Sequence, residues 1–204
     1  VRRSLDLDPK NPDFKPGDAN PYGVWASRKV AYVVDGGSNT LTRIDEKGHM
    51  RALAYLPNPP GPAKQRFPYD AVPTCVTKVG KSIFIGDLAG RLWRWDGKLM
   101  TQLTVPEGMH FTACAGDGKG HLYLVSIFSF GSQGPEANSG KVLRYSIDSD
   151  EAEVMTEGLN QPGGVAVDRD GGVYVSNNST CPADISKLPQ GVCPAPGEIV
   201  KLRS

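Results

Sequence analysis

The stretch Pro162-Gly163-Gly164-Val165, followed by Tyr174-Val175-Ser176-Asn177, contains the pattern that decides the fold. A short apolar entry leads through a glycine-containing turn to a strand with one aromatic and several small apolar residues, and a polar turn follows. The same pattern occurs three more times, at Pro21–Asp35, Pro73–Asp87 and Thr112–Ser126. Units of ~40–50 residues that contain only short strands are typical of a β-propeller.

We therefore expect an all-β fold, a β-propeller of four-stranded blades, with about four blades in this chain. The blade boundaries are expected near 20–60, 70–109, 110–160 and 161–204, within one domain that spans 1–204 or is the C-terminal part of a propeller. Residues 1–19 are expected to supply a closing strand or a strand of a preceding blade. Trp93 and Trp95 alternate along one strand, which predicts packing between blades.

Composition limits the classes of function. Apolar residues make up 39% of the chain and charged residues 22%, which is ordinary for a folded soluble protein. A net charge of +1 gives no broad attraction to nucleic acid. The chain has no apolar run of the ~18 residues that a membrane span needs. We therefore expect no nucleic-acid partner, and we expect no segment of this sequence to span a membrane.

The cysteines suggest the compartment. Cys181 and Cys193 bracket a proline-rich insertion, and a disulfide closing that loop would stabilise the fold by ~3 kcal/mol in the simple loop model. Such a bridge predicts an oxidising compartment, extracellular or periplasmic. Cys75 and Cys114 occupy equivalent positions in neighbouring repeats. We interpret them as two small buried hydrophobic residues, with a bridge between adjacent inner strands as the alternative.

A resemblance sharpens this interpretation. The segment Asp18-Ala19-Asn20-Pro21-Tyr22-Gly23-Val24 resembles the "DSNPYG" signature of the ScyD/ScyE family of NHL-repeat-like β-propeller proteins. The segments Asp70–Thr74 and Pro162–Ser179 are similar to two further motifs of that family, in the same order. The resemblance implies export and a six-bladed ring, to which this chain contributes about four blades. Additional polypeptide is then expected to complete the propeller. The resemblance to this family implies no particular biochemical activity.

Candidate binding residues gather on one face of the predicted disc. Antiparallel strands alternate in direction, so the entry to strand one and the loop after strand two open on the same side. Two insertions, 128–139 and 179–196, belong to that side, and long loops on a rigid scaffold often carry function. The candidate ligand or channel-face residues are Asn20, Asp35, Asp87, Phe128, Phe130 and Asn177.

Three interpretations of function remain open. We favour a secreted, non-catalytic binding scaffold that holds a protein, glycan or small molecule, with Phe128 and Phe130 as anchors and no resident cofactor. The alternative is a calcium-dependent, lactonase-like hydrolase, because Ca²⁺ prefers oxygen ligands. The candidate metal ligands are Asp35, Asp87 and Asn177, and the candidate bases are Asp70 and His110. The third is a structural role in assembly with other blades.

Each of these residues also has a simpler interpretation. Asp35 and Asp87 match ordinary turn chemistry, in which a carboxylate accepts hydrogen bonds from nearby backbone amides. For His110 we favour a loop position over a role as a base. Asn177-Asn178-Ser179-Thr180 contains two overlapping glycosylation sequons, at Asn177 and Asn178, that would be used only in a eukaryotic secretory pathway.

Overall fold

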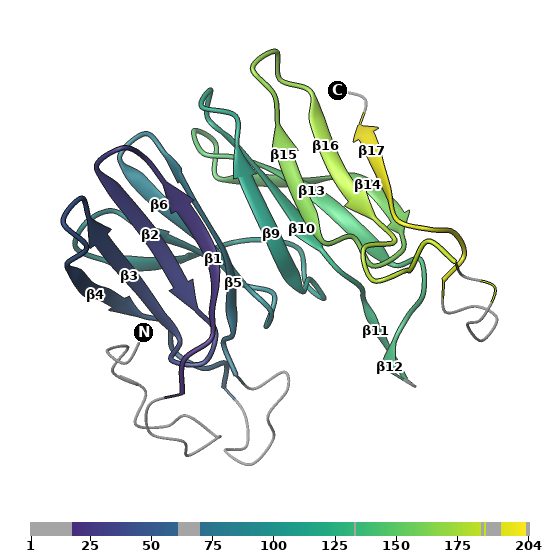
Figure 1. Ribbon diagram of the computed structural model, residues 1–204, viewed down its shortest axis with the longest axis horizontal. Helices are drawn as coiled ribbons and strands as arrows, with labels where there is room; N and C mark the ends of the chain where they lie inside the picture. The colour runs from purple at the N-terminus through teal and green to yellow at the C-terminus, as the bar shows by residue number, and fades with distance from the viewer. Residues whose placement is uncertain (1–17, 61–69, 133, 185, 187–192, 203–204) are drawn as a thin grey trace.

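The computed structural model describes residues 18–60, 70–132, 134–184, 186 and 193–202. These residues fold into antiparallel sheets arranged as four blades of a β-propeller (Figure 1). This arrangement confirms the predicted fold class. The strand predicted within 1–19 lies almost entirely outside the described residues, so that expectation stays a prediction.

Each blade is an antiparallel meander in which consecutive strands pair. Blade one contains β1 (Pro21–Ala26), β2 (Val30–Asp35), β3 (Thr40–Asp45) and β4 (Met50–Tyr55). Blade two contains β5 (Pro73–Val79), β6 (Ser82–Asp87), β7 (Leu92–Trp95) and β8 (Met100–Leu103). Blade three contains β9 (Phe111–Gly116), β10 (His121–Ser126), β13 (Gly140–Ser146) and β14 (Glu151–Leu159). Blade four contains β15 (Gly164–Val167), β16 (Val173–Asn177) and β17 (Glu198–Leu202). The insertion in blade three forms a separate hairpin of β11 (Phe130–Gly131) and β12 (Gly134–Pro135).

The hydrophobic cores lie between blades, because each sheet is apolar on both faces. One core joins blades one and two, a second joins blades two and three, and a third joins blades three and four. Trp93 is buried in the core between blades one and two, and Trp95 packs against the same core. The predicted role of this tryptophan pair in packing between blades is confirmed.

In blades one, two and three, the second strand follows one rule of side-chain direction. Its aromatic residue packs into the core shared with the following blade, as Tyr32, Phe84 and Tyr123 do. The aliphatic residues on either side of the aromatic point to the opposite face and pack against the preceding blade, as Ile83 and Ile85 do. This alternation is the period-two pattern of a strand, and it stacks the blades in one direction.

The first strands of the blades lie side by side, with β1 against β5, β5 against β9 and β9 against β15. Side-chain hydroxyls link them: Thr74 Oγ1 donates to the carbonyl of Phe111, and Thr112 Oγ1 donates to the carbonyl of Pro162. These strands therefore form the inner edge of the propeller, as the repeat pattern predicts.

A disulfide joins Cys75 on β5 to Cys114 on β9, with 5.6 Å between the two Cα atoms. The interpretation of these cysteines as two separate buried residues is therefore wrong, and the alternative is correct. Cys75 and Cys114 occupy equivalent positions along two adjacent inner strands, so their side chains lie next to each other and the sulfurs can bond. Gly86 leaves the space, because a Cβ atom there would lie 2.9 Å from Cys75 Sγ.

The other predicted bridge is confirmed: Cys181 and Cys193 form a disulfide. Among the described residues no cysteine is free. Two disulfides in one small chain indicate an oxidising environment. In the parts of the chain that the structure describes, nothing helical is long and apolar enough to cross a membrane.

Candidate functional site

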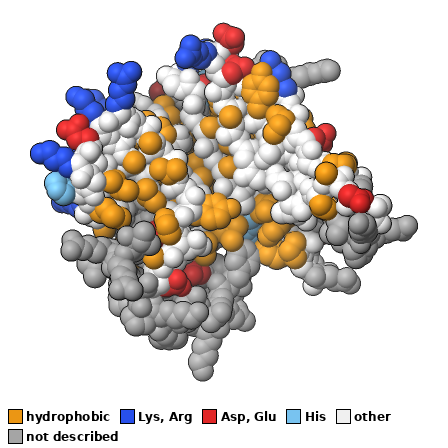
Figure 2. Space-filling model, viewed as in Figure 1, with side chains coloured by type: hydrophobic (Ala, Val, Ile, Leu, Met, Phe, Trp, Pro, Cys, Tyr) orange, Lys and Arg blue, Asp and Glu red, His pale blue; other side chains and the backbone are white. Residues whose placement is uncertain are grey.

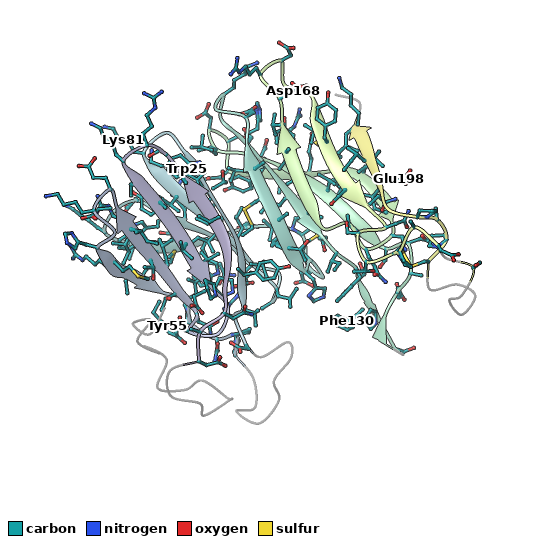
Figure 3. All side chains as sticks on the ribbon, viewed as in Figure 1. Trp25, Tyr55, Lys81, Phe130, Asp168 and Glu198 are labelled. Atoms are coloured by element: carbon teal, nitrogen blue, oxygen red, sulfur yellow. A yellow bond between two sulfur atoms is a disulfide. The ribbon has the colours of Figure 1, made fainter. Side chains whose placement is uncertain are left out.

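The second strands of all four blades end on the same side of the molecule, at Asp35, Asp87, Ser126 and Asn177. We call this side the insertion face, because it also carries the β11–β12 hairpin and the loop closed by Cys181–Cys193 (Figure 1). In Figure 3, Phe130 lies at this end of the molecule and Lys81 and Asp168 lie at the other end. The described parts of both insertions therefore lie on one face, as the strand directions predict.

One backbone hydrogen bond recurs on this face in every blade. The amide that follows strand two donates to the carbonyl of the residue that enters strand one, with N···O distances between 2.8 and 3.0 Å. The donor and acceptor pairs are Gly36 and Asn20, Leu88 and Val72, Ile127 and His110, and Asn178 and Asn160. This hydrogen bond fixes the position of each entry loop relative to the end of the second strand in the same blade.

In three blades the polar residue at the end of strand two reinforces this contact. Asp35 Oδ1, Ser126 Oγ and Asn177 Oδ1 each accept the entry-loop amide at 2.8 Å. Asp35 Oδ1 also accepts the amides of Gly37 and Ser38. Turn chemistry, the simpler of the two interpretations of Asp35, is therefore what its contacts show.

Asp87 departs from this pattern. Its side chain is fully buried and turns toward β7, where Oδ2 accepts from Trp93 Nε1 at 2.9 Å and from Arg91 Nε at 2.8 Å. Burial raises the pKa of the Asp87 carboxyl, while the charge of Arg91 and the Trp93 indole act in the opposite direction. The carboxylate joins two strands of blade two at the edge of the core.

Asp70 is part of a polar clamp between blades one and two. Asn39 is fully buried, and its Nδ2 donates to Asp70 Oδ1 at 2.7 Å and to Asn58 Oδ1 at 3.1 Å. Asn39 Oδ1 accepts the amide of Val72 at 3.0 Å. Val72 has φ 45°, which is rare for a branched residue, and this hydrogen bond holds it there. Repeat counting did not single out Asn39 as the centre of a clamp.

His110 belongs to an aromatic cluster with Phe128 and Phe130. Its Nδ1 lies 2.8 Å from the carbonyl of Leu88 and donates to it, because a carbonyl can only accept. The Phe130 ring meets the His110 ring edge-on at 4.9 Å, and the Phe128 ring lies 5.5 Å from His110 and 5.0 Å from Phe130. Such edge-on contacts are favourable for aromatic pairs.

The hairpin that carries Phe130 is held at its base. Ser139 Oγ accepts the amide of Ser129 at 2.7 Å and donates to the carbonyl of Glu136 at 2.7 Å. His110 is 7% exposed, whereas Phe130 remains 43% exposed despite its ring contacts. The cluster therefore presents one large apolar side chain to solvent on a braced support.

The second insertion leaves Asn177 and Asn178 little freedom. Asn177 Nδ2 donates to Glu198 Oε1 at 2.9 Å, while its Oδ1 is held by the entry loop. Asn178 is 2% exposed. Its side-chain Oδ1 accepts a hydrogen bond from Asn160 Nδ2, and its Nδ2 donates to the carbonyl of Pro196. A glycan on either amide would require this turn to open, and modification of these sequons stays a prediction.

The predicted metal ligands Asp35, Asp87 and Asn177 make their hydrogen bonds within their own blades. In the described part of the chain, no group of three His, Cys, Asp or Glu side chains could hold a metal ion. The residues that the structure does bring together are His110 with the two phenylalanines, and Asp70 with Asn39.

The fold and this face define the class: a β-propeller with loop insertions on one side. No protein-family model and no curated protein matches the chain. Among solved structures it is similar to virginiamycin B lyase from Staphylococcus aureus, a catalytically inactive form with quinupristin, at TM-score 0.60 and 16% identity over 79% of this chain and 50% of that one. A streptogramin B lyase structure gives TM-score 0.61 and 13% identity over 79% of this chain and 49% of that one.

A nidogen/laminin complex also matches, at TM-score 0.60 and 16% identity over 81% of this chain and 60% of the matched chain. At such low identity these likenesses show the fold alone. The chain spans about half to three fifths of the length of these propellers.

Proposed function

We propose that this chain is part of an exported, non-catalytic binding propeller of the ScyD/ScyE type. The insertion face holds a partner, and Phe130 is the apolar anchor. The observation that carries the proposal is the aromatic cluster, in which a buried histidine and a second phenylalanine support an exposed one. Aromatic side chains on a rigid support are frequent centres of binding energy.

The two disulfides support export, because such bridges persist in oxidising compartments. The partner class that fits best is a protein surface with an apolar side chain to pack against Phe130 and Phe128. A glycan or an aromatic small molecule could also stack on Phe130, and both are outcomes of the experiment below. One structural neighbour is a propeller lyase and another comes from a protein complex, so the fold leaves both chemistries available.

The calcium-dependent hydrolase has less support than binding. The carboxylates and amide proposed as ligands, and Asp70 as a base, are already engaged in turns and in the clamp between blades one and two. An unchanged melting temperature in EDTA and in added Ca²⁺ is the result expected for the binding propeller. A clear rise in melting temperature with Ca²⁺ would favour the enzyme instead.

The test places a photo-crosslinking phenylalanine analogue at position 130 and, as a matched control, at position 99. Leu99 is 63% exposed, but it lies in the β7–β8 turn of blade two, at the end of that blade opposite the insertion face. We expect crosslinks to one defined partner from position 130 and none to that partner from position 99.

With the partner purified, Phe130→Ala should weaken binding by roughly 30-fold, the effect of losing a hot-spot aromatic, and Leu99→Ala should not. Leu99→Ala should melt close to the wild-type temperature, because Leu99 is 63% exposed. Phe130→Ala also loses the ring contacts with His110 and Phe128, so its binding is measured well below its own melting temperature. Equal binding by the two variants would refute the proposed anchor. Crosslinks to a glycan or a small molecule alone would redirect the assignment of partner class.

A further inference from the structure

Two neighbouring turns on the insertion face are apolar where the equivalent turns of the other blades are not. After strand two, blade two continues with Leu88-Ala89 and blade three with Ile127-Phe128. Blade one has Gly36-Gly37 at this point, and blade four has Asn178-Ser179. All four apolar residues are partly exposed, and none belongs to the three cores between blades. Packing within those cores therefore does not account for them.

Contacts between blades two and three join these apolar turns. The His110 ring of blade three donates from Nδ1 to the carbonyl of Leu88 in blade two, at 2.8 Å. In the same turn of blade two, a Cβ atom at Gly90 would lie 3.0 Å from the carbonyl carbon of Met109, so the turn packs directly on the entry to blade three. The Leu88 turn therefore borders the aromatic cluster around His110. We call this junction the seam.

The two sides of the seam are held at a fixed spacing. The amide of Leu88 donates to the carbonyl of Val72 at 3.0 Å, which ties the turn to its own blade. Arg91, at the end of the turn, forms an ion pair with Asp87 at 2.8 Å. The Cys75–Cys114 disulfide joins the same two blades at the inner edge. Binding to a surface that is already ordered loses less conformational entropy, so the seam is well suited to hold a partner.

The chemistry of the seam favours apolar side chains of a protein over a glycan. The carboxylate of Asp87 is fully buried in its bonds within blade two, and Ser126 Oγ accepts the amide of His110. The partly exposed side chains of Leu88 and Phe130 offer only aliphatic and aromatic carbon. Figure 2 shows hydrophobic side chains on both sides of the junction between the left and right halves of the molecule, near the insertion face. Sugar hydroxyls covered by such a surface would lose hydrogen bonds to water without replacement, which is unfavourable.

We propose that the partner held at Phe130 also packs on the Leu88–Ala89 turn, and that this partner is a protein segment with two apolar side chains, one for each side of the seam. The proposal rests on the proposed function, because it extends the Phe130 anchor from blade three to blade two. Leu88 then determines specificity: a partner with a single apolar group gains the Phe130 contact alone, whereas a segment with two correctly spaced groups gains both.

The probe is a library of random linear peptides displayed on phage, selected for binding to the wild-type chain and against binding to Phe130→Ala. We expect the selected peptides to share two apolar residues at a constant spacing. Leu88→Ser should weaken their binding on the order of tenfold, the effect of one lost apolar contact, and Leu88→Met should retain it.

Two further variants complete the comparison. Ala89→Asp introduces a charge into the same turn and should also weaken peptide binding, because the charge must be covered by apolar groups. Leu99→Ser changes an exposed leucine at the opposite end of blade two and should bind as wild type does. Leu88 lies outside the three cores, so Leu88→Ser should keep the wild-type fold, which its melting temperature checks.

Failure of the seam and failure of the anchor give different results. Peptides that need Phe130 but bind Leu88→Ser and Ala89→Asp as tightly as wild type would overturn the seam and leave the anchor in place. If no selected peptide depends on Phe130, the anchor is refuted and the seam with it. The same proteins are also applied to an array of immobilised glycans. Glycan binding that Phe130→Ala abolishes and Leu88→Ser leaves unchanged would overturn the assignment of a protein segment as the partner.

Discussion

Cys75 and Cys114 form a covalent bond between the inner strands of two neighbouring blades, 39 residues apart in the sequence. The bond stands where β5 and β9 already share a hydrogen bond from Thr74 to Phe111. It therefore locks blade two to blade three at the inner edge of the propeller. The Cys181–Cys193 bridge is different, because it closes a surface loop within blade four and spans 12 residues.

Removing the inner bridge should cost more stability than removing the loop bridge. The loop model gives about 4 kcal/mol for a loop of the Cys75–Cys114 length and about 3 kcal/mol for the shorter loop. We expect paired alanine substitutions at positions 75 and 114 to lower the free energy of unfolding more than the same change at 181 and 193. Urea unfolding of both variants measures this. A larger loss from the loop pair would contradict the assignment of the inner bridge as a link between blades.

The close approach of strands around that bridge makes Gly86 intolerant of a side chain. A Cβ atom at position 86 would lie 2.9 Å from Cys75 Sγ and 3.0 Å from Phe111 Cβ. Gly86→Ala should lower the free energy of unfolding by about 1–3 kcal/mol through overpacking. Gly164→Ala on β15 is the matched control, because its nearest neighbour would be Ser176 Oγ at 3.3 Å. Equal melting temperatures for the two variants would show that the inner strands lie farther apart than described.

The clamp between blades one and two predicts a pH-dependent variant. Asn39→Asp replaces the Nδ2 donor with an oxygen 2.7 Å from Asp70 Oδ1, so that two carboxylates meet in a buried site. We expect a loss of about 2–4 kcal/mol at neutral pH, since one partner of a buried hydrogen bond becomes a like charge. The repulsion raises the pKa of the pair in the folded variant, so its stability recovers as the pH falls.

Melting temperature as a function of pH, measured against wild type, tests this variant. The deficit should shrink toward acid pH, where the two carboxyls share a proton. Asn138→Asp is the control, because Asn138 has a similar φ of 55° in an exposed turn. A deficit that stays constant across the pH range would mean that Asp70 does not face position 39.

Turn carboxylates at the end opposite the insertion face should make the fold sensitive to acid. At Asp117, burial opposes ionisation, but hydrogen bonds from the backbone of His121 and Lys119 and from the His121 ring outweigh it and lower the pKa. Backbone hydrogen bonds likewise lower the pKa of Asp45, Asp96 and Asp168. A lowered folded-state pKa contributes stability above the unfolded value of about 3.9, and that stability is lost as the pH falls through the folded value.

Asp117→Asn should therefore lower the melting temperature by roughly 2–4 °C at neutral pH, the shift expected for about 1 kcal/mol in a chain of this size. The difference from wild type should vanish in acid, where wild-type Asp117 is itself protonated. Differential scanning calorimetry in a series of buffers measures it. A difference that grows toward low pH would have the wrong sign for this account.

The fold could be predicted from sequence because the signal repeats. Tyr32, Phe84, Tyr123 and Tyr174 recur with the same neighbours, and a period of this kind specifies both the strands and their order. The Cys181–Cys193 bridge was also predictable, because a proline-rich loop has no core of its own. The shared face of the two insertions followed from strand direction alone.

The contacts on that face could not be predicted in the same way. Asp35 and Asp87 stand at the same repeat position, yet one caps its own entry loop and the other pairs with Arg91 and Trp93. The difference comes from Trp93 on β7 and from Arg91 just before it, because the repeat pattern specifies neither residue. The Cys75–Cys114 bridge had a sequence signal, equal spacing before the strand aromatic, but spacing gives height along a strand and not the distance between strands.

The account rests on blades stacked in chain order around an inner edge formed by β1, β5, β9 and β15. Peptide mapping of the native, unreduced protein tests this order most directly. The account predicts two linked peptide pairs, one joining Cys75 to Cys114 and one joining Cys181 to Cys193. A pairing of Cys75 or Cys114 with either cysteine of the blade-four loop, or free thiols at 75 and 114, would contradict it.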